Sequence, residues 1–402
     1  MKKCCILGLG YIGLPTAAII SNAGHYVVGV DVREDIISSL NAGNTHFHED
    51  GLDELISKGL KNKKFLATNS PKDSDVFIIS VPTPSIEKNG LPQPDLSFVF
   101  NAVNSICDVL KKDDILIIES TIPLGTTDKI EAIIKTKTNL NRDLVHICYC
   151  PERVLPGNII YELINNNRVI GGLTEKASNL AIKFYSTFCK GNLSKTNAIT
   201  AEMVKLTENS FRDVNIAFAN ELSMICHNFE IDTERLIDLA NLHPRVDILR
   251  PGCGVGGHCI AIDPWFIVSA APKDSILIKT AREVNNKKPK WIIEKILEKT
   301  NELNKSFRDE IKVGIFGITF KPNVEDTRES PALNIALQII KKKIKVQIAE
   351  PNLKSHDGLK IYDLNYVVEN SNLLVFLVAH EEFKSLDLKN KIFLDFCGVS
   401  KK

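Results

Sequence analysis

The sequence predicts an α/β protein with two doubly wound, parallel-sheet domains joined by a central domain of long helices. Short runs that are apolar throughout recur along residues 1–195, separated by polar or helical stretches. A stretch with helical spacing and no proline then covers 200–229, and further short apolar runs follow residue 310. At 402 residues the chain is too long for one ordinary core, so two or three domains are expected.

The first domain is expected over residues 1–195 and begins with a β-α-β unit. Residues 2–7 are expected to form a strand, 14–23 a helix and 26–30 a second strand. Because the apolar runs lack an alternating polar face, they are typical of parallel strands covered by helices on both sides. Further strands are expected at 76–81, 115–119 and 144–149.

The central domain is expected over residues 196–305, and the third over 306–402. The central domain combines the helix over 200–229 with a second helix over 275–303, which we expect to kink at Pro289. The polar segment 301–310 predicts a linker. The third domain then opens with a strand and a glycine turn, and its strands are expected at 312–316, 346–349, 373–378 and 392–396.

The composition excludes several classes of partner. Fifty basic and 49 acidic residues give a net charge of +1, so no nucleic-acid or membrane partner is expected. The apolar stretch 4–20 superficially resembles a signal peptide, but three glycines and a proline interrupt it. The ten cysteines are scattered through expected strands and helices, which suits a reducing cytoplasm. His146, Cys148 and Cys150 alternate along a buried strand, so no metal site is expected.

The tract Gly8-Leu9-Gly10-Tyr11-Ile12-Gly13 predicts a dinucleotide site in a Rossmann-like domain. The first glycine permits a tight turn, the second lets a pyrophosphate approach, and the third lets the helix pack on the strand. Asp31, at the end of the next strand, would accept hydrogen bonds from the adenosine ribose and repel a 2′-phosphate. Arg33 is the opposing signal, because it could pair with that phosphate, but two residues beyond an acidic one it could equally be a solvated charge or a lid over the adenine. We therefore expect NAD as the cofactor.

Two threonines also follow expected strands, where open α/β sheets bind their ligands. They are Thr83 in Pro82-Thr83-Pro84 and Thr121 in Ser120-Thr121-Ile122-Pro123. Their hydroxyls could contact cofactor or substrate, although simple strand-ending turns would explain either tract.

The glycine-rich tract 252–264 carries the most informative candidates for chemistry. Cys259 ends the glycines at the expected start of a helical turn, a position that favours a thiolate. Asp263 lies four residues later, hence on the same face of such a turn. The alternative is a buried structural cysteine.

Polar side chains on the long helix supply a second set of candidates. Lys205, Asn209 and Arg212 project from one face, which could equally be the solvated stripe of an amphipathic helix. Glu152 and Arg153 lie at a strand end, and His243 and Arg245 form a further basic pair.

Taken together, these tracts resemble the nucleotide-sugar dehydrogenases of the UDP-glucose/GDP-mannose dehydrogenase superfamily, which use two NAD per turnover. The resemblance runs nearly end to end, and two tracts, CPERVLPG (150–157) and GGHCIAIDPWF (256–266), look like those of members that act on UDP-N-acetylmannosamine. Cys253 departs from the proline that is usual there. The motifs that carry the resemblance are GLGYIGLP, VPTP, ESTIPLGTT, CPERVLPG, TAEMVKLTENSFRDVNIAFANEL, GVGGHCIAIDPW and FGITFKPNVEDTRESPA.

The resemblance implies a four-electron oxidation of a sugar alcohol to a carboxylate. Lys205, with a water, would assist removal of the hydroxyl proton, and Asn209 would help stabilise the oxyanion. Cys259 would form a thiohemiacetal and then a thioester, with Glu152 and Asp263 as candidates for activating the hydrolytic water.

The resemblance also implies binding residues and a setting. Arg328 would close over cofactor or ligand, the enzyme would be a homodimer, and its product would enter a surface polysaccharide. UDP-N-acetylglucosamine or UDP-glucose are alternative substrates, a single-step dehydrogenase is an alternative enzyme, and a non-catalytic NAD-binding scaffold is an alternative of another class. The residues implied for the UDP-sugar are Arg153, Val154, Lys205, Asn209, Arg212, His243, Arg245, Gly257, Phe320 and Lys321.

Overall fold

The computed structural model describes residues 1–88, 90–155, 157–257, 259–306 and 310–400. It divides into two compact units, Met1–Thr207 with Trp265–Ala270, and Glu208–Pro264 with Ala271–Lys402. Pro156 and His258, which belong to two of the motifs above, lie outside the described residues, as do 307–309 of the expected linker.

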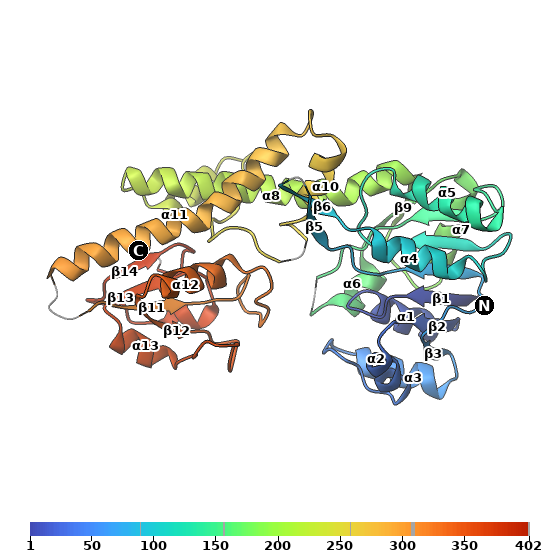
Figure 1. The fold of residues 1–402 in the computed structure, drawn as a ribbon, viewed down its shortest axis with the longest axis horizontal. Helices are drawn as coiled ribbons and strands as arrows, with labels where there is room; N and C mark the ends of the chain where they lie inside the picture. The colour runs from blue at the N-terminus through green and yellow to red at the C-terminus, as the bar shows by residue number, and fades with distance from the viewer. Residues whose placement is uncertain (89, 156, 258, 307–309, 401–402) are drawn as a thin grey trace. The chain divides into compact units, whose positions relative to one another are not determined.

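The first unit is built on an eight-stranded sheet with the order β10-β9-β8-β7-β4-β1-β2-β3 (Figure 1). Neighbouring strands are parallel except β8 and β9, which pair antiparallel. The strands are β1 (Lys3–Leu7), β2 (Tyr26–Val30), β3 (Phe65–Thr68), β4 (Val76–Ile79), β7 (Ile115–Ile118), β8 (His146–Tyr149), β9 (Arg168–Gly172) and β10 (Leu193–Asn197). The five strands expected for this domain are confirmed, with small differences at their ends.

Successive residues of the central strands belong to two separate cores. Cys4 and Ile6 of β1 pack into one core, whereas Cys5 and Leu7 pack into the other. Because helices cover both faces, the last four residues of β1 and every position of β4, β7 and β8 are buried, which explains why these strands read as continuous apolar runs. The helices of this unit are α1 (Gly13–Asn22), α2 (Glu34–Asn41), α3 (Leu52–Lys61), α4 (Ser97–Ile106), α5 (Thr126–Thr138), α6 (Ile159–Asn165) and α7 (Glu175–Tyr185).

Several elements of the first unit escaped the sequence analysis. Strands β9 and β10 extend the sheet beyond β8, and β5 (Ser85–Lys88) and β6 (Leu91–Pro94) form a separate antiparallel hairpin. Strand β9 matters for the site, since its antiparallel course places its first residue, Arg168, at the edge where β4, β7 and β8 end.

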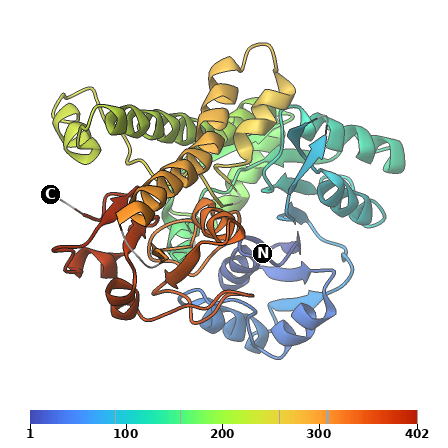
Figure 2. The same cartoon turned by 60° about the vertical axis from the view of Figure 1, so that its left-hand side comes forward.

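The second unit contains a parallel four-stranded sheet with the order β12-β11-β13-β14. Helix α12 packs on this sheet, and helix α11 packs on α12. Figure 2 shows α11 running beside α12 and the sheet. All four strands expected in the third domain are confirmed. The elements are β11 (Lys312–Phe316), β12 (Lys345–Ala349), β13 (Leu373–Phe376), β14 (Phe393–Asp395), α9 (Thr233–Ala240), α11 (Ile276–Ser306), α12 (Pro331–Lys341) and α13 (Leu364–Asn370).

Both long helices are confirmed. Helix α8 (Ala198–Asn228) begins in the first unit and continues in the second, and α11 runs through Pro289 without ending. The expected linker over 301–310 is wrong in its first part, because α11 extends to Ser306. Leu303 explains the difference, since it is buried in the same core as Val313 and Ile315 of β11. Within the described residues, no helix is long and apolar enough to cross a membrane.

Candidate active site

The glycine turn between β1 and α1 has the geometry of a dinucleotide site. Gly8 has φ +91°, and its N–H donates to Val30 O at 2.8 Å. A Cβ added to Gly13 would lie 1.8 Å from Gly8 O, so only glycine lets the helix pack there. A Cβ added to the exposed Gly10 would meet no described atom within 4 Å. The space above the second glycine is therefore available to a phosphate group.

Asp31 lies beside this turn and is held by backbone donors. Its Oδ2 accepts from Leu9 N at 3.0 Å and its Oδ1 from Arg33 N at 3.0 Å. The exposed Arg33 guanidinium is paired with Asp35, so its charge is already engaged away from a 2′-phosphate. Both features fit NAD rather than NADP. The Tyr11 ring packs on Phe47 at 4.4 Å, and Ile12, Thr83 and Thr121 are half-buried.

Glu152 and Lys205 meet at the carboxyl end of β8. Lys205 Nζ donates to the backbone carbonyl of Glu152 at 2.8 Å, and the Glu152 carboxylate is paired with Arg168 at 2.8 Å. The first turns of α8 are anchored to the same unit by Glu202, whose carboxylate accepts from Thr127 N at 2.8 Å and Gly125 N at 2.6 Å. Glu202 thereby fixes where Lys205 lies, a role that sequence reasoning did not assign.

The loop after Glu152 is tied down along its length. Arg153 N donates to Glu152 Oε1 at 2.7 Å, and the Arg153 guanidinium bonds to Asn167 O. Val154 packs on the small core of Ile19, Ile159 and Leu163. The buried Glu49 accepts from Gly157 N at 2.9 Å and Ile159 N at 2.7 Å. Glu49 was not foreseeable from the sequence, because its partners lie more than one hundred residues away.

In the second unit, Asn209 and Asp263 form a buried pair. Asn209 Nδ2 donates to Asp263 Oδ2, and Arg212 donates to Asn209 Oδ1. Asn209 is 2% and Asp263 4% exposed. A solvated stripe is therefore the wrong interpretation for Asn209, although Arg212 is exposed.

Cys259 opens the turn that leads into α10 (Asp263–Ala270), as the sequence predicts. Its carbonyl accepts from Ile262 N at 3.0 Å and from Asp263 N at 2.9 Å. Eight of the ten cysteines are buried and Cys397 is half-buried, whereas Cys259 is exposed. The alternative of a buried structural cysteine is thus wrong for this residue.

Close packing explains two of the glycines that precede Cys259, Gly256 and Gly257. Gly252 N donates to Asn220 Oδ1 of α8 at 2.9 Å. A Cβ on Gly256 would lie 2.6 Å from Glu329 O, and one on Gly257, which has φ +77°, would lie 3.1 Å from the Phe320 ring. Cys253 is buried, and its thiol donates to Leu377 O at 3.0 Å. The loop is therefore fixed against α8 and the third-domain sheet, with Phe320 in direct contact.

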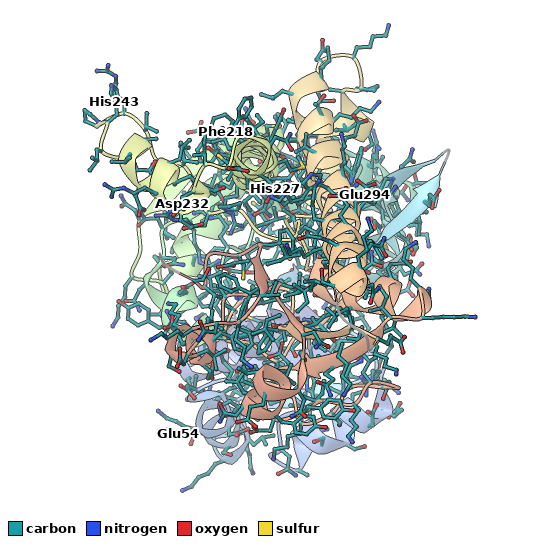
Figure 3. The ribbon with its side chains drawn as sticks, turned by 90° about the vertical axis from the view of Figure 1, so that its left-hand side faces the viewer. Glu54, Phe218, His227, Asp232, His243 and Glu294 are labelled. Atoms are coloured by element: carbon teal, nitrogen blue, oxygen red, sulfur yellow. The ribbon has the colours of Figure 1, made fainter. Side chains whose placement is uncertain are left out.

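The remaining candidates are basic side chains, of which His243, Arg245 and Arg328 are exposed and Lys321 is half-buried. Figure 3 shows His243 at the outer end of the turn after α9, where Arg245 N donates to His243 Nδ1 at 3.3 Å. Arg328 is paired with Asp326 at 2.6 Å, and Lys321 Nζ lies 5.6 Å from the Phe320 ring centroid. Among the residues whose placement is described, no three His, Cys, Asp or Glu side chains group so that they could hold a metal ion.

Comparison with known families covers almost the whole chain. Residues 2–189 match the NAD binding domain of the UDP-glucose/GDP-mannose dehydrogenase family, 199–287 its central domain and 314–402 its UDP binding domain. The glycine turn and Asp31 lie in the first match, Asn209 and Cys259 in the second, and Phe320 in the third.

Individual relatives agree with this assignment. The chain is 43% identical to a UDP-N-acetyl-D-mannosamine dehydrogenase of Campylobacter jejuni, over 98% of this chain and 99% of that one. It is 40% identical to an NDP-N-acetyl-D-galactosaminuronic acid dehydrogenase of Ralstonia nicotianae, over 98% and 95%. A solved UDP-N-acetylmannosamine dehydrogenase from Pyrococcus horikoshii superposes with a TM-score of 0.90 at 39% identity, over 100% and 96%. The chain belongs to the UDP-glucose/GDP-mannose dehydrogenase family and is an NAD-dependent nucleotide-sugar dehydrogenase.

Proposed function

We propose that the protein oxidises the C6 hydroxyl of UDP-N-acetyl-D-mannosamine to a carboxylate and releases UDP-N-acetyl-D-mannosaminuronate. The observation that carries the reaction type is Cys259, the exposed thiol at the start of the turn into α10. An oxidation that stopped at the aldehyde would need no thiol. The sugar is suggested by the substrates of the relatives and by the CPERVLPG and GGHCIAIDPWF tracts.

Lys205 and Asn209 are assigned to the first oxidation. Lys205, held by the carbonyl of Glu152, assists a water in taking the C6 hydroxyl proton. Asn209 is oriented by Asp263 and Arg212 and stabilises the negative charge that develops on that oxygen. Bound NAD supplies the hydride acceptor in both oxidations, and it would be held by Gly8, Gly10, Gly13 and Asp31.

Cys259 is assigned to the second oxidation. Its thiolate adds to the aldehyde carbon, and the oxygen takes a proton to give a thiohemiacetal. This adduct carries a hydride on carbon; transfer of that hydride to the bound cofactor and loss of the hydroxyl proton leave a thioester. Water then adds to the acyl carbon, the C–S bond breaks, and the carboxylate and thiol are released. Glu152 and Asp263 are the candidates for accepting the water proton.

Binding of the UDP-sugar is assigned to side chains with suitable charge or contact. The substrate diphosphate is anionic and the net charge of the protein is only +1, so local cations must supply the attraction. Gly257 and Phe320 are in contact and would pack against the nucleotide portion. The residues proposed are Arg153, Val154, Arg212, His243, Arg245, Gly257, Phe320 and Lys321, with Arg328 closing over cofactor or substrate.

We also propose a homodimer formed through α8, a cytoplasmic location and a role in surface-polysaccharide synthesis. Phe211, Phe218 and Ile225 are 67%, 52% and 45% exposed and recur every seven residues, so they form one apolar stripe. In Figure 3, Phe218 lies on the side of α8 opposite His227, which packs edge-on against Trp291 of α11 at 5.2 Å. We assign NAD binding to residues 1–195, dimerisation and the catalytic cysteine to residues 196–305, and UDP binding to residues 306–402.

The decisive experiment is the number of NADH formed per UDP-sugar consumed. UDP-N-acetylmannosamine should give two, with UDP-N-acetylglucosamine, UDP-glucose and UDP-N-acetylgalactosamine run in parallel. One NADH per sugar would remove the role of Cys259. Two NADH with another sugar would keep the mechanism and change the substrate, and binding of NAD without any turnover would favour a scaffold.

A further inference from the structure

A buried polar network lies behind Glu152 in the first unit. Glu119 follows β7 and is buried, accepting from Ser80 Oγ at 2.9 Å and from Tyr185 OH at 2.7 Å. Burial raises the pKa of Glu119, and the nearby Arg168 cation opposes that rise. None of these side chains belongs to the reaction proposed above, so their burial together calls for an explanation.

Arg168 joins this network to Glu152. Its Nη1 donates to Glu152 Oε2 at 2.8 Å and its Nη2 to Leu163 O at 3.1 Å. The guanidinium also lies over the Tyr185 ring, 4.9 Å from its centroid. Arg168 is 4% exposed and the Glu152 side chain 8%. With three contacts in a buried setting, the guanidinium has little freedom, and it holds the carboxylate in one orientation.

The sheet topology explains why these two residues meet. Strands β8 and β9 are antiparallel, with Cys148 opposite Gly172 and Tyr149 opposite Gly171. Continued by three residues, the same register brings Arg168 opposite Glu152. A parallel β9 would begin at the other edge of the sheet, so the reversal of this one strand creates the ion pair.

We propose that Arg168 is a positioning residue for thioester hydrolysis, acting through Glu152. The inference rests on the proposed function. In the step concerned, the water oxygen bonds to the acyl carbon, and one water proton passes to the Glu152 carboxylate. The C–S bond breaks with its electron pair on the Cys259 sulfur, which takes up a proton from solvent, and Glu152 gives its proton back to solvent. Arg168 keeps the carboxylate aimed, and the Glu152 carbonyl holds Lys205 for the earlier oxidation.

Other charged or titratable groups lie around the Arg168–Glu152 ion pair. Glu119 follows β7, Cys150 follows β8 with its sulfur 4.0 Å from Arg168 Nη1, and Tyr185 ends α7. Lys205 approaches from α8 and Arg153 is the next residue in the loop. Arg168 is the cation shared by Glu119 and Glu152, so its removal affects both carboxyls.

The test compares the NADH burst with steady-state turnover for Arg168→Gln, using the full enzyme, NAD and UDP-N-acetylmannosamine. Hydride steps precede hydrolysis, so a burst of two NADH per active site should remain. Steady-state turnover should fall on the order of 10²-fold, and acyl-enzyme on Cys259 should accumulate in the mass spectrum of quenched samples. Arg142→Gln is the matched control, because Arg142 also bridges two carboxylates, Asp128 and Glu131, and its kcat should not change.

A double-mutant cycle separates positioning from a general structural role. If Arg168 acts through Glu152, Arg168→Gln should have little further effect on hydrolysis in a Glu152→Gln background. Additive effects, or equal slowing of burst and steady state, would overturn the inference. If Arg168→Gln does not fold, Arg168→Lys keeps the cation, and the same cycle applies with about tenfold slowing expected. Failure of the wild-type enzyme to release two NADH would instead reject the proposed function, and the inference with it.

Discussion

Gly13 is packed so tightly against Gly8 that a methyl group on it would lie 1.8 Å from the Gly8 carbonyl oxygen. Gly10, between them in the same turn, has no described atom within 4 Å of such a methyl group. The two glycines are therefore required for different reasons. One permits the helix to approach the strand, whereas the other leaves space for a ligand.

Substitution of these glycines should separate folding from cofactor binding. Gly10→Ala should leave the melting temperature almost unchanged but raise KM for NAD about tenfold or more, since the methyl group occupies the pyrophosphate position. Gly13→Ala should prevent the first unit from folding. Circular dichroism melts and NAD titrations check both. A Gly10→Ala enzyme with normal KM would place the cofactor elsewhere.

Cys259 should be the one cysteine that reacts rapidly with iodoacetamide in the native enzyme. Burial raises the pKa of Cys5 to about 11 and that of Cys150 and Cys253 to about 12, so these thiols are both covered and protonated at neutral pH. The fraction of activity lost should equal the fraction of Cys259 that is labelled, with labelling measured by peptide mass mapping and activity by NADH formation. Rapid labelling that persists in Cys259→Ala would show that another thiol reacts.

Gly257→Ala should destabilise the second unit and weaken UDP binding. Its left-handed φ costs a non-glycine residue about 1–2 kcal/mol, and the added methyl group would press on the Phe320 ring. Gly252→Ala is the matched control in the same loop, because its added Cβ would meet nothing within 4 Å. Urea unfolding and UDP titration measure both effects, and equal behaviour of the two variants would contradict the explanation.

Lys288→Met should stabilise the protein at pH 7. Burial lowers the pKa of Lys288 from 10.5 to about 8. Below pH 8 the folded protein therefore holds a buried positive charge, which destabilises it. Between pH 8 and 10.5 the unfolded state binds more protons, and wild-type stability rises with pH. A shift of this size corresponds to about 3 kcal/mol, and loss of the hydrogen bond to Ser223 offsets about 1 kcal/mol.

The measurement is urea unfolding of wild type and Lys288→Met at pH 7 and pH 10. The advantage of the variant should shrink at pH 10, where the folded lysine is neutral. Lys287→Met, at an exposed neighbouring position of α11, should show no such dependence. A pH-independent advantage would mean that packing, rather than charge burial, sets the effect.

Phe218→Glu should shift the protein from dimer to monomer. A carboxylate in the centre of the α8 stripe would have to be buried without a partner in the dimer. The free-energy cost exceeds about 1.4 kcal/mol, so the dissociation constant of the dimer should rise more than tenfold. Sedimentation velocity over a concentration series measures the dissociation constant. Phe98→Glu, at a 47% exposed phenylalanine of α4, is the control and should not change it. A monomeric wild type would reject the proposed dimer.

The candidate site was foreseeable from the sequence where local rules apply. The glycine turn and Asp31 follow from spacing within one β-α-β unit, and the long helices follow from periodicity. The extent of α11 did not, since residues 301–306 look polar, and Leu303 among them packs in the third-domain core. Glu49 and Glu202 were likewise missed, because carboxylates that anchor distant backbone leave no local pattern.

The sequence by itself determined the fold class, the cofactor turn and the residue types available for chemistry, since each depends on contacts between near neighbours in the chain. Only the tertiary structure decided which of ten cysteines is exposed, that Asn209 is buried against Asp263, and that Arg168 holds Glu152. These depend on strand register and on packing between distant segments. No short-range spacing rule encodes them.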